Sequence, residues 1–89
     1  MAKITGTLKN GFGYEVDDNV FHSMRFVDAL AAAGAGDIAK FSEVIKMLFG
    51  EEQREALYCH IEGCGEEPTI EMMDAIITEI GDNIPQGKN

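Results

Sequence analysis

The sequence has 89 residues, 45% of them hydrophobic and 26% charged, a composition typical of one globular domain rather than of a disordered chain. Its 16 acidic and 7 basic residues give a formal net charge of −9, which disfavours binding to nucleic acid or to an anionic membrane surface. The acidity leaves two interpretations open: a surface that self-repulsion keeps soluble, or a face that meets a basic partner.

The first segment in chain order, residues 3–16, is expected to form a β-hairpin. Residues 4–8 alternate apolar and polar side chains, and residues 12–16 alternate again. Asn10-Gly11 between them is typical of a two-residue type I′ turn, because both residues tolerate positive φ. The face expected to point inward carries Ile4, Leu8, Phe12 or Tyr14, and Val16. A lone hairpin is only marginally stable in water, so this one must pack on the segments that follow.

Four short helices are expected after the hairpin, at about residues 20–33, 37–49, 51–62 and 69–80. Asp37 is a suitable N-cap for the second of them, and Gly50 is placed to cap its C-terminus. Gly81 is expected to end the fourth helix. Residues 83–89 are expected to form a flexible C-terminal tail.

The side chains that point inward follow from apolar spacing at 3.6 residues per turn. In the first helix they are Val20, Met24, Val27, Leu30 and Ala31. In the second they are Ile38, Phe41, Val44, Ile45 and Leu48. In the third and fourth they are Leu57 and Ile61, then Ile70, Met73, Ile76, Ile77 and Ile80. Because these one-sided helices must share one core, the predicted fold is mainly α with a short N-terminal β-hairpin, a compact bundle of about four short helices in a single domain of residues 1–82.

Cysteine and histidine are the residues in this chain most suited to catalysis or metal binding. Cys59 and His60 are adjacent, so on a helix their side chains point about 100° apart and cannot act as a nucleophile–base pair. Together with Cys64 and His22 they supply four zinc ligands by type, but the spacing fits no zinc motif. The sequence therefore predicts no enzyme, no cofactor and no metal site, and the roles of Cys59, His60 and Cys64 stay open.

Export and membrane insertion are not expected either. The N-terminal residues lack the apolar stretch of a signal peptide, and no run of about eighteen apolar residues occurs in the chain. The two cysteines are therefore expected to be free thiols in a cytoplasmic protein.

Four apolar side chains fall outside or at the margin of the predicted inward stripes. They are candidates for contacting a partner: Phe21, Phe26, Met47 and Met72. Methionine beside aromatic rings suits a surface that accepts varied apolar partners, because its side chain is flexible and polarisable. A binding face of this kind is permitted by the sequence.

Three segments carry a resemblance to a known family: KNGFGYEVDDN at residues 9–19, FVDAL at 26–30 and LFGEEQ at 48–53. In this order they resemble a tail assembly chaperone of siphophages or related prophages of Gram-positive bacteria. The two cysteines and His60 belong to no motif of that family.

The resemblance implies a function without catalysis. Such chaperones bind the long, helical, apolar tape measure protein in the host cytoplasm, keep it soluble, promote polymerisation of tail-tube protein around it, and are absent from the mature virion. It implies no cofactor, and it leaves self-assembly into a homo-oligomer open. Frameshifting often extends the product in this family, and codons for residues 86–88 are compatible with a slippery site. The alternative is an acidic helical adaptor or regulatory protein that binds another partner helix.

Overall fold

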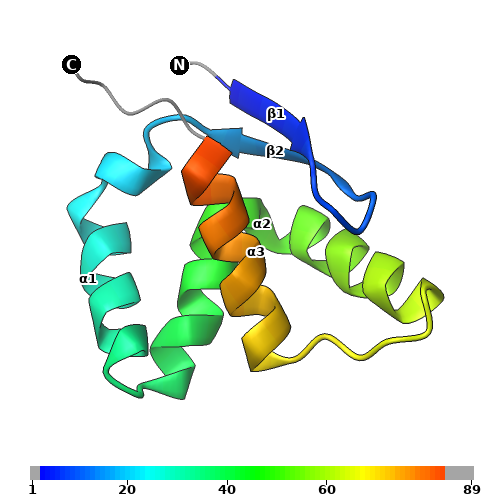
Figure 1. The fold of residues 1–89 in the computed structure, drawn as a ribbon. Coiled ribbons are helices and arrows are strands. Elements are labelled where there is room, and N and C mark those ends of the chain that lie inside the picture. The colour runs from blue at the N-terminus through cyan, green and yellow to red at the C-terminus, as the bar shows by residue number, and fades with distance from the viewer. Residues whose placement is uncertain (1–2, 84–89) are drawn as a thin grey trace.

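The computed structural model describes residues 3–83, which form two strands, a short 3₁₀ helix and three α-helices (Figure 1). The fold is mainly helical with an N-terminal β-hairpin, as predicted. The tail predicted at residues 83–89 lies outside the described residues except for Asn83, and so does the segment 86–88 of the frameshift hypothesis.

Strands β1 (Lys3–Thr7) and β2 (Gly13–Asp17) form the predicted antiparallel hairpin, with Ile4 opposite Val16. Its inward face is confirmed, because the expected side chains are buried or partly buried in the core: Ile4, Leu8, Phe12, Tyr14 and Val16. Gly6 has a specific place on this face, since a Cβ at that position would lie 2.6 Å from the hydroxyl oxygen of Tyr14. The Tyr14 ring therefore lies over the glycine.

The turn of the hairpin differs from the predicted type I′ form. Gly11 has a φ of 93°, but Asn10 does not adopt positive φ. The Gly11 N–H donates to the carbonyl of Leu8 and the Leu8 N–H donates to the carbonyl of Phe12, both at 2.8 Å, so residues 9–11 form a longer loop with a bulge at the glycine. The Asn10 side chain accepts a hydrogen bond from the Phe12 N–H at 2.9 Å, a local bond that asparagine makes in turns.

The predicted first helix, residues 20–33, is divided at Ser23. The 3₁₀ helix η1 spans Val20–His22, and α1 spans Met24–Gly34. Ser23 has an extended backbone, with φ −77° and ψ 126°, so helical geometry is interrupted there and starts again.

The predicted inward stripe of this helix is confirmed only in part. Val20 and Leu30 are partly buried against the core, but Ala31, Met24 and Val27 are exposed. Met24 and Val27 are 65% and 37% exposed, whereas Phe26 and Ala29 are buried. Phe26 is the largest apolar side chain of α1, and burying it removes more apolar area from water than burying Met24 or Val27 would. Its ring packs nearly edge-on against Phe21, with the ring centroids 5.0 Å apart.

Helix α2 spans Ile38–Gly63 and contains both the second and the third predicted helices. The described residues therefore form three α-helices rather than about four. Gly50 joins the two halves with a non-helical φ of 79° and ψ of 167°, and the chain changes direction there (Figure 1). Gly50 was predicted to cap the end of a helix. It is instead a bend within α2, because the second half of the helix follows it without an intervening loop.

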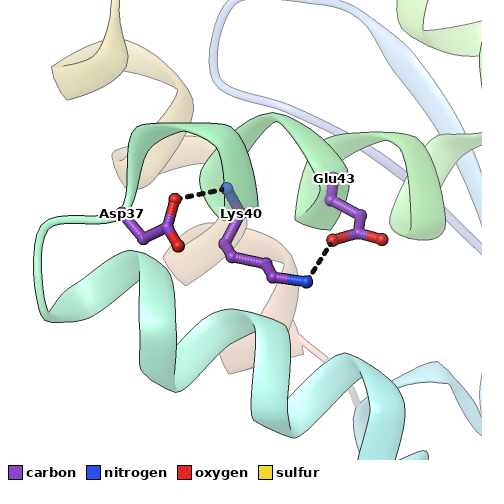
Figure 2. Close-up of polar contacts among 3 residues, drawn as sticks. All are labelled: Asp37, Lys40 and Glu43. Atoms are coloured by element: carbon purple, nitrogen blue, oxygen red, sulfur yellow. Dashed lines mark hydrogen bonds and ion pairs between the residues drawn. The ribbon is translucent and has the colours of Figure 1, made fainter.

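The N-terminus of α2 is capped by Asp37, as predicted. Its Oδ1 accepts a hydrogen bond from the backbone N–H of Lys40 at 3.2 Å (Figure 2). The Lys40 side chain extends along the helix surface to Glu43, with Nζ 3.1 Å from Oε1. Both side chains are about half exposed, so this pair adds little stability, but it directs the lysine charge toward Glu43.

Helix α3 spans Ile70–Asn83, beyond the predicted end at residue 80. The Thr69 Oγ1 accepts a hydrogen bond from the Met72 N–H at 3.1 Å and so caps the first turn. Gly81, predicted to end the helix, lies inside it. A Cβ at Gly81 would be 3.7 Å from the Phe21 ring, an ordinary van der Waals distance, so Phe21 packs beside α3 at this position.

Buried side chains from the hairpin and all three α-helices form one hydrophobic cluster. Nine residues of the later predicted stripes are buried in it, as expected: Val44, Ile45, Leu48, Leu57, Ile61, Met73, Ile76, Ile77 and Ile80. Two others are not, since Ile38 is 67% exposed and Ile70 is 49% exposed. Within the described residues, no helix combines the length and hydrophobicity that crossing a lipid bilayer requires.

The side chain of Gln53 holds β2 against the second half of α2. Its amide oxygen accepts a hydrogen bond from the Glu15 N–H at 2.7 Å, and its amide nitrogen donates to the Glu15 carbonyl at 2.8 Å. The same nitrogen lies 3.1 Å from the carbonyl of Phe49, one turn earlier in α2. Gln53 thus provides hydrogen-bond partners for the N–H and the carbonyl of Glu15 on the outer edge of β2.

Gln53→Ala is expected to lower the free energy of unfolding by about 1–3 kcal/mol, because these backbone groups lose their partners. Glu52→Ala, at the exposed neighbouring position, is the matched control and should leave it nearly unchanged. Urea unfolding measures the difference, and amide hydrogen exchange at Glu15 should accelerate only in Gln53→Ala. Unchanged exchange at Glu15 would show that Gln53 does not hold the strand.

Candidate functional site

Helix α3 lies farther from its neighbours than α1 and α2 lie from each other. Few Cα atoms of α3 come within 8 Å of another element, whereas α1 and α2 pack closely. The helix reaches the core through long side chains, those of Met73, Ile76, Ile77 and Ile80. Because these side chains hold the helix at a distance, the surface is hollowed on both sides of α3.

The larger hollow is an open groove of about 630 Å³ that is lined by residues of α1, of α3 and of the first half of α2. The arrangement of these helices is shown in Figure 1. We call this hollow the α1–α3 groove. Its α1 side is formed by Leu30, Ala33 and Gly34, and Phe41 of α2 also lines it. The groove is within the size range of ligand-binding clefts, roughly 300–1,000 Å³, and an elongated apolar groove is suited to an amphipathic helix.

One end of the groove continues into a smaller pocket of about 170 Å³. Phe41 and Ile70 line both hollows, and Ile38 lines the smaller one. Ile38 and Ile70 are the first residues of α2 and α3 and are two of the most exposed large apolar side chains among the described residues. Exposed apolar side chains that gather at a groove are typical of an interaction site.

The α3 side of the groove is acidic. Glu71, Asp74 and Asp82 line it together with Thr78, and no lysine or arginine among residues 3–83 does. The site therefore combines apolar walls with a carboxylate rim along one side.

Two of the four partner-binding candidates from the sequence lie at the α1–α3 groove or just below it. Phe21 is partly buried and lines the groove. Phe26 lies beneath it with no exposed surface, so the hypothesis that Phe26 contacts a partner is wrong: its ring is needed in the core.

The other two candidates lie elsewhere. Met47 is 36% exposed and lies on another surface, beside charged residues that include Arg25 and Lys40. Met72 is partly buried and lines the hollow on the other side of α3, a pocket of about 280 Å³ beneath the hairpin turn. The Lys9 N–H donates to the Glu79 carboxylate at 3.0 Å across the edge of this pocket. The sequence candidates therefore do not form one surface.

Cys59, His60 and Cys64 do not assemble into a reactive centre. Cys59 and Cys64 are exposed free thiols, and the Cys59 Sγ lies 4.0 Å from a carboxylate oxygen of Glu55. His60 serves the fold: its Nε2 hydrogen-bonds the carbonyl of Asn10 at 2.8 Å, and its ring packs against Phe12. Among residues 3–83, no group of three or more histidine, cysteine, aspartate or glutamate side chains is arranged to hold a metal ion.

Comparison of the chain with family models, with curated proteins and with solved structures finds no match. The α1–α3 groove is therefore interpreted from its own residues. An apolar, open groove with acidic groups on one side can bind a helix.

Proposed function

We propose that this protein is a tail assembly chaperone of the kind its sequence resembles, which binds helical segments of a tape measure protein and keeps them soluble. The α1–α3 groove and its exposed end, with Ile38, Phe41 and Ile70, support this proposal. A long apolar helix aggregates in water, and a groove that covers its apolar stripe removes that surface from solvent. The net charge of −9 would keep the resulting complex soluble.

The proposal places the protein in the cytoplasm of the bacterial host, during assembly and not in the mature virion. Holding the tape measure protein in an extended, soluble form would let tail-tube protein polymerise around it. Binding and release of a helix need no cofactor and no catalytic residue.

The proposal is tested by co-expressing the protein with the tape measure protein encoded in the same genome. The native chain should bring the tape measure protein into the soluble fraction and co-purify with it. The double variant Ile38→Asp/Ile70→Asp should reduce co-purification by about ten-fold or more, because charges would enter the apolar contact. Both substitutions lie at helix N-termini, where a carboxylate is favourable, so the fold should be kept.

Met47→Asp, a single substitution, is the control on the other exposed surface. It also adds one carboxylate at an exposed apolar position, and it should leave co-purification unchanged if the partner lies in the α1–α3 groove. Loss of the partner only with Met47→Asp would move the site to the surface between α1 and α2. A tape measure protein that stays insoluble with the native chain would contradict the proposed function and favour an adaptor for another helix.

A further inference from the structure

The two sides of the α1–α3 groove differ in charge. On the α1 side the lining residues are apolar or small, namely Leu30, Ala33 and Gly34. On the α3 side, Glu71, Asp74, Thr78 and Asp82 follow one another at spacings of three or four residues, so they form one stripe along the helix. The stripe covers about three turns, or roughly 16 Å, with carboxylates at both ends.

These carboxylates have no basic partner among residues 3–83. The ion pairs there join Lys40 to Glu43, and Lys46 and Arg54 to Glu51, all of them within α2. Helix α3 contains four acidic residues and no basic one. Glu71, Asp74 and Asp82 are exposed, so a partner in the groove can reach them.

We infer that the α1–α3 groove binds an amphipathic helix that carries lysine or arginine along one flank of its apolar stripe, and that this basic flank lies against α3. The inference deepens the proposed function and rests on it for the identity of the natural partner. The small residues Ala33 and Gly34 let the other flank approach α1 closely, so that flank carries small or apolar side chains. This difference between the two sides fixes the orientation of the bound helix, because only one orientation places its basic flank against α3.

Charge along one side mainly affects partner choice and association rate. Complementary charges at the rim of an apolar contact speed encounter and disfavour partners of the wrong sign. Exposed ion pairs are each weak and are screened by salt, so the apolar groove supplies most of the affinity.

Two designed helical peptides of about 18 residues, long enough to follow α3, test the inference. They share one leucine and isoleucine stripe and differ only in carrying lysine or glutamate along the same flank. Fluorescence anisotropy with the full-length protein should show the lysine peptide binding about ten-fold more tightly at low ionic strength, and the preference should shrink in about 0.5 M salt. Equal affinities for the two peptides would overturn the inference.

Variants that replace carboxylates with neutral amides show which residues cause the preference for the lysine peptide. Glu71→Gln/Asp74→Asn/Asp82→Asn should reduce the lysine preference to about two-fold or less. The matched triple Glu52→Gln/Glu55→Gln/Glu62→Gln removes the same charge from exposed positions in the second half of α2 and should keep the preference. An equal loss in both triples would show that net charge, not the groove, selects the peptide, and would also overturn the inference.

The same set of proteins separates this inference from the proposed function. The tape measure protein could co-purify equally with the native chain and with Glu71→Gln/Asp74→Asn/Asp82→Asn. This result would be consistent with the chaperone function and would contradict the inferred basic flank. A lysine peptide that binds in the groove, combined with a tape measure protein that stays insoluble, would support the basic helix and contradict the tape measure partner.

Discussion

Ile45→Asp is expected to leave the protein largely unfolded at room temperature in water. Ile45 is 1% exposed, and no polar or charged residue is buried among the described residues to pair with a new carboxylate. Losing the isoleucine side chain costs about 2–5 kcal/mol, and burying an unpaired charge adds several more. The total is comparable with the stability of a domain of this size, about 5–10 kcal/mol.

Circular dichroism and the dispersion of amide signals in NMR spectra measure the outcome. Ile38→Asp is the matched control, because it makes the same change in the same helix at a position that is 67% exposed. It should change the free energy of unfolding by less than about 1 kcal/mol, since the carboxylate stays in water near the helix N-terminus. A folded Ile45→Asp variant with native-like spectra would show that the inward face of α2 has been placed incorrectly.

Local sequence patterns were sufficient to predict the buried face of an element where one of its faces is clearly apolar. The hairpin shows strict alternation, so its inward face was predicted even though the turn type was not. Val44, Ile45 and Leu48 form the only strong apolar stripe in the first half of α2, and Asp37 precedes it as a cap. In such elements the local sequence is enough to indicate which side chains are buried.

Helix α1 shows where a local pattern is ambiguous. Its sequence has two apolar stripes, one with Met24 and Val27 and one with Phe26 and Ala29. Periodicity alone does not choose between them. The choice depends on Phe21 and on the helices that surround Phe26 in the folded protein, so it is decided by tertiary packing.

Apart from Phe21, the residues of the candidate site were not predicted, because the groove results from the spacing between helices. Ile38 and Ile70 continue the apolar stripes of their helices, so both were expected in the core. Each begins its helix, where the stripe passes beyond the part of the core that neighbouring elements cover. The acidity of α3 was visible in the sequence, but its position opposite the apolar side of α1 was not.

Gly50→Ala is expected to lower the free energy of unfolding by about 1–3 kcal/mol, measured by urea unfolding. Gly50 has φ 79° and ψ 167°, a conformation that residues with a Cβ rarely adopt. Among residues 3–83, apart from the chain neighbours and the nearby backbone of α2, no atom lies within 4 Å of the position of an added Cβ. The cost therefore comes from the backbone and not from a collision.

Gly63→Ala is the matched control, with the opposite sign. Gly63 ends α2, has no positive φ, and also has open space around an added Cβ. Alanine there should stabilise the protein by about 0.5–1 kcal/mol, because it restricts the unfolded chain without straining the folded one.

D-Alanine at position 50, introduced by chemical synthesis, should restore the stability that L-alanine removes, because positive φ is the normal range of a D residue. A Gly50→Ala variant as stable as the native chain would mean that α2 does not need its bend. The bend has a structural purpose, since it lets the first half of α2 pack on α1 while Gln53 and His60 of the second half hold the hairpin. The buried side chains of α3 belong to one cluster with those of both halves of α2, so a change of the bend is expected to affect the core beneath the acidic side of the groove as well.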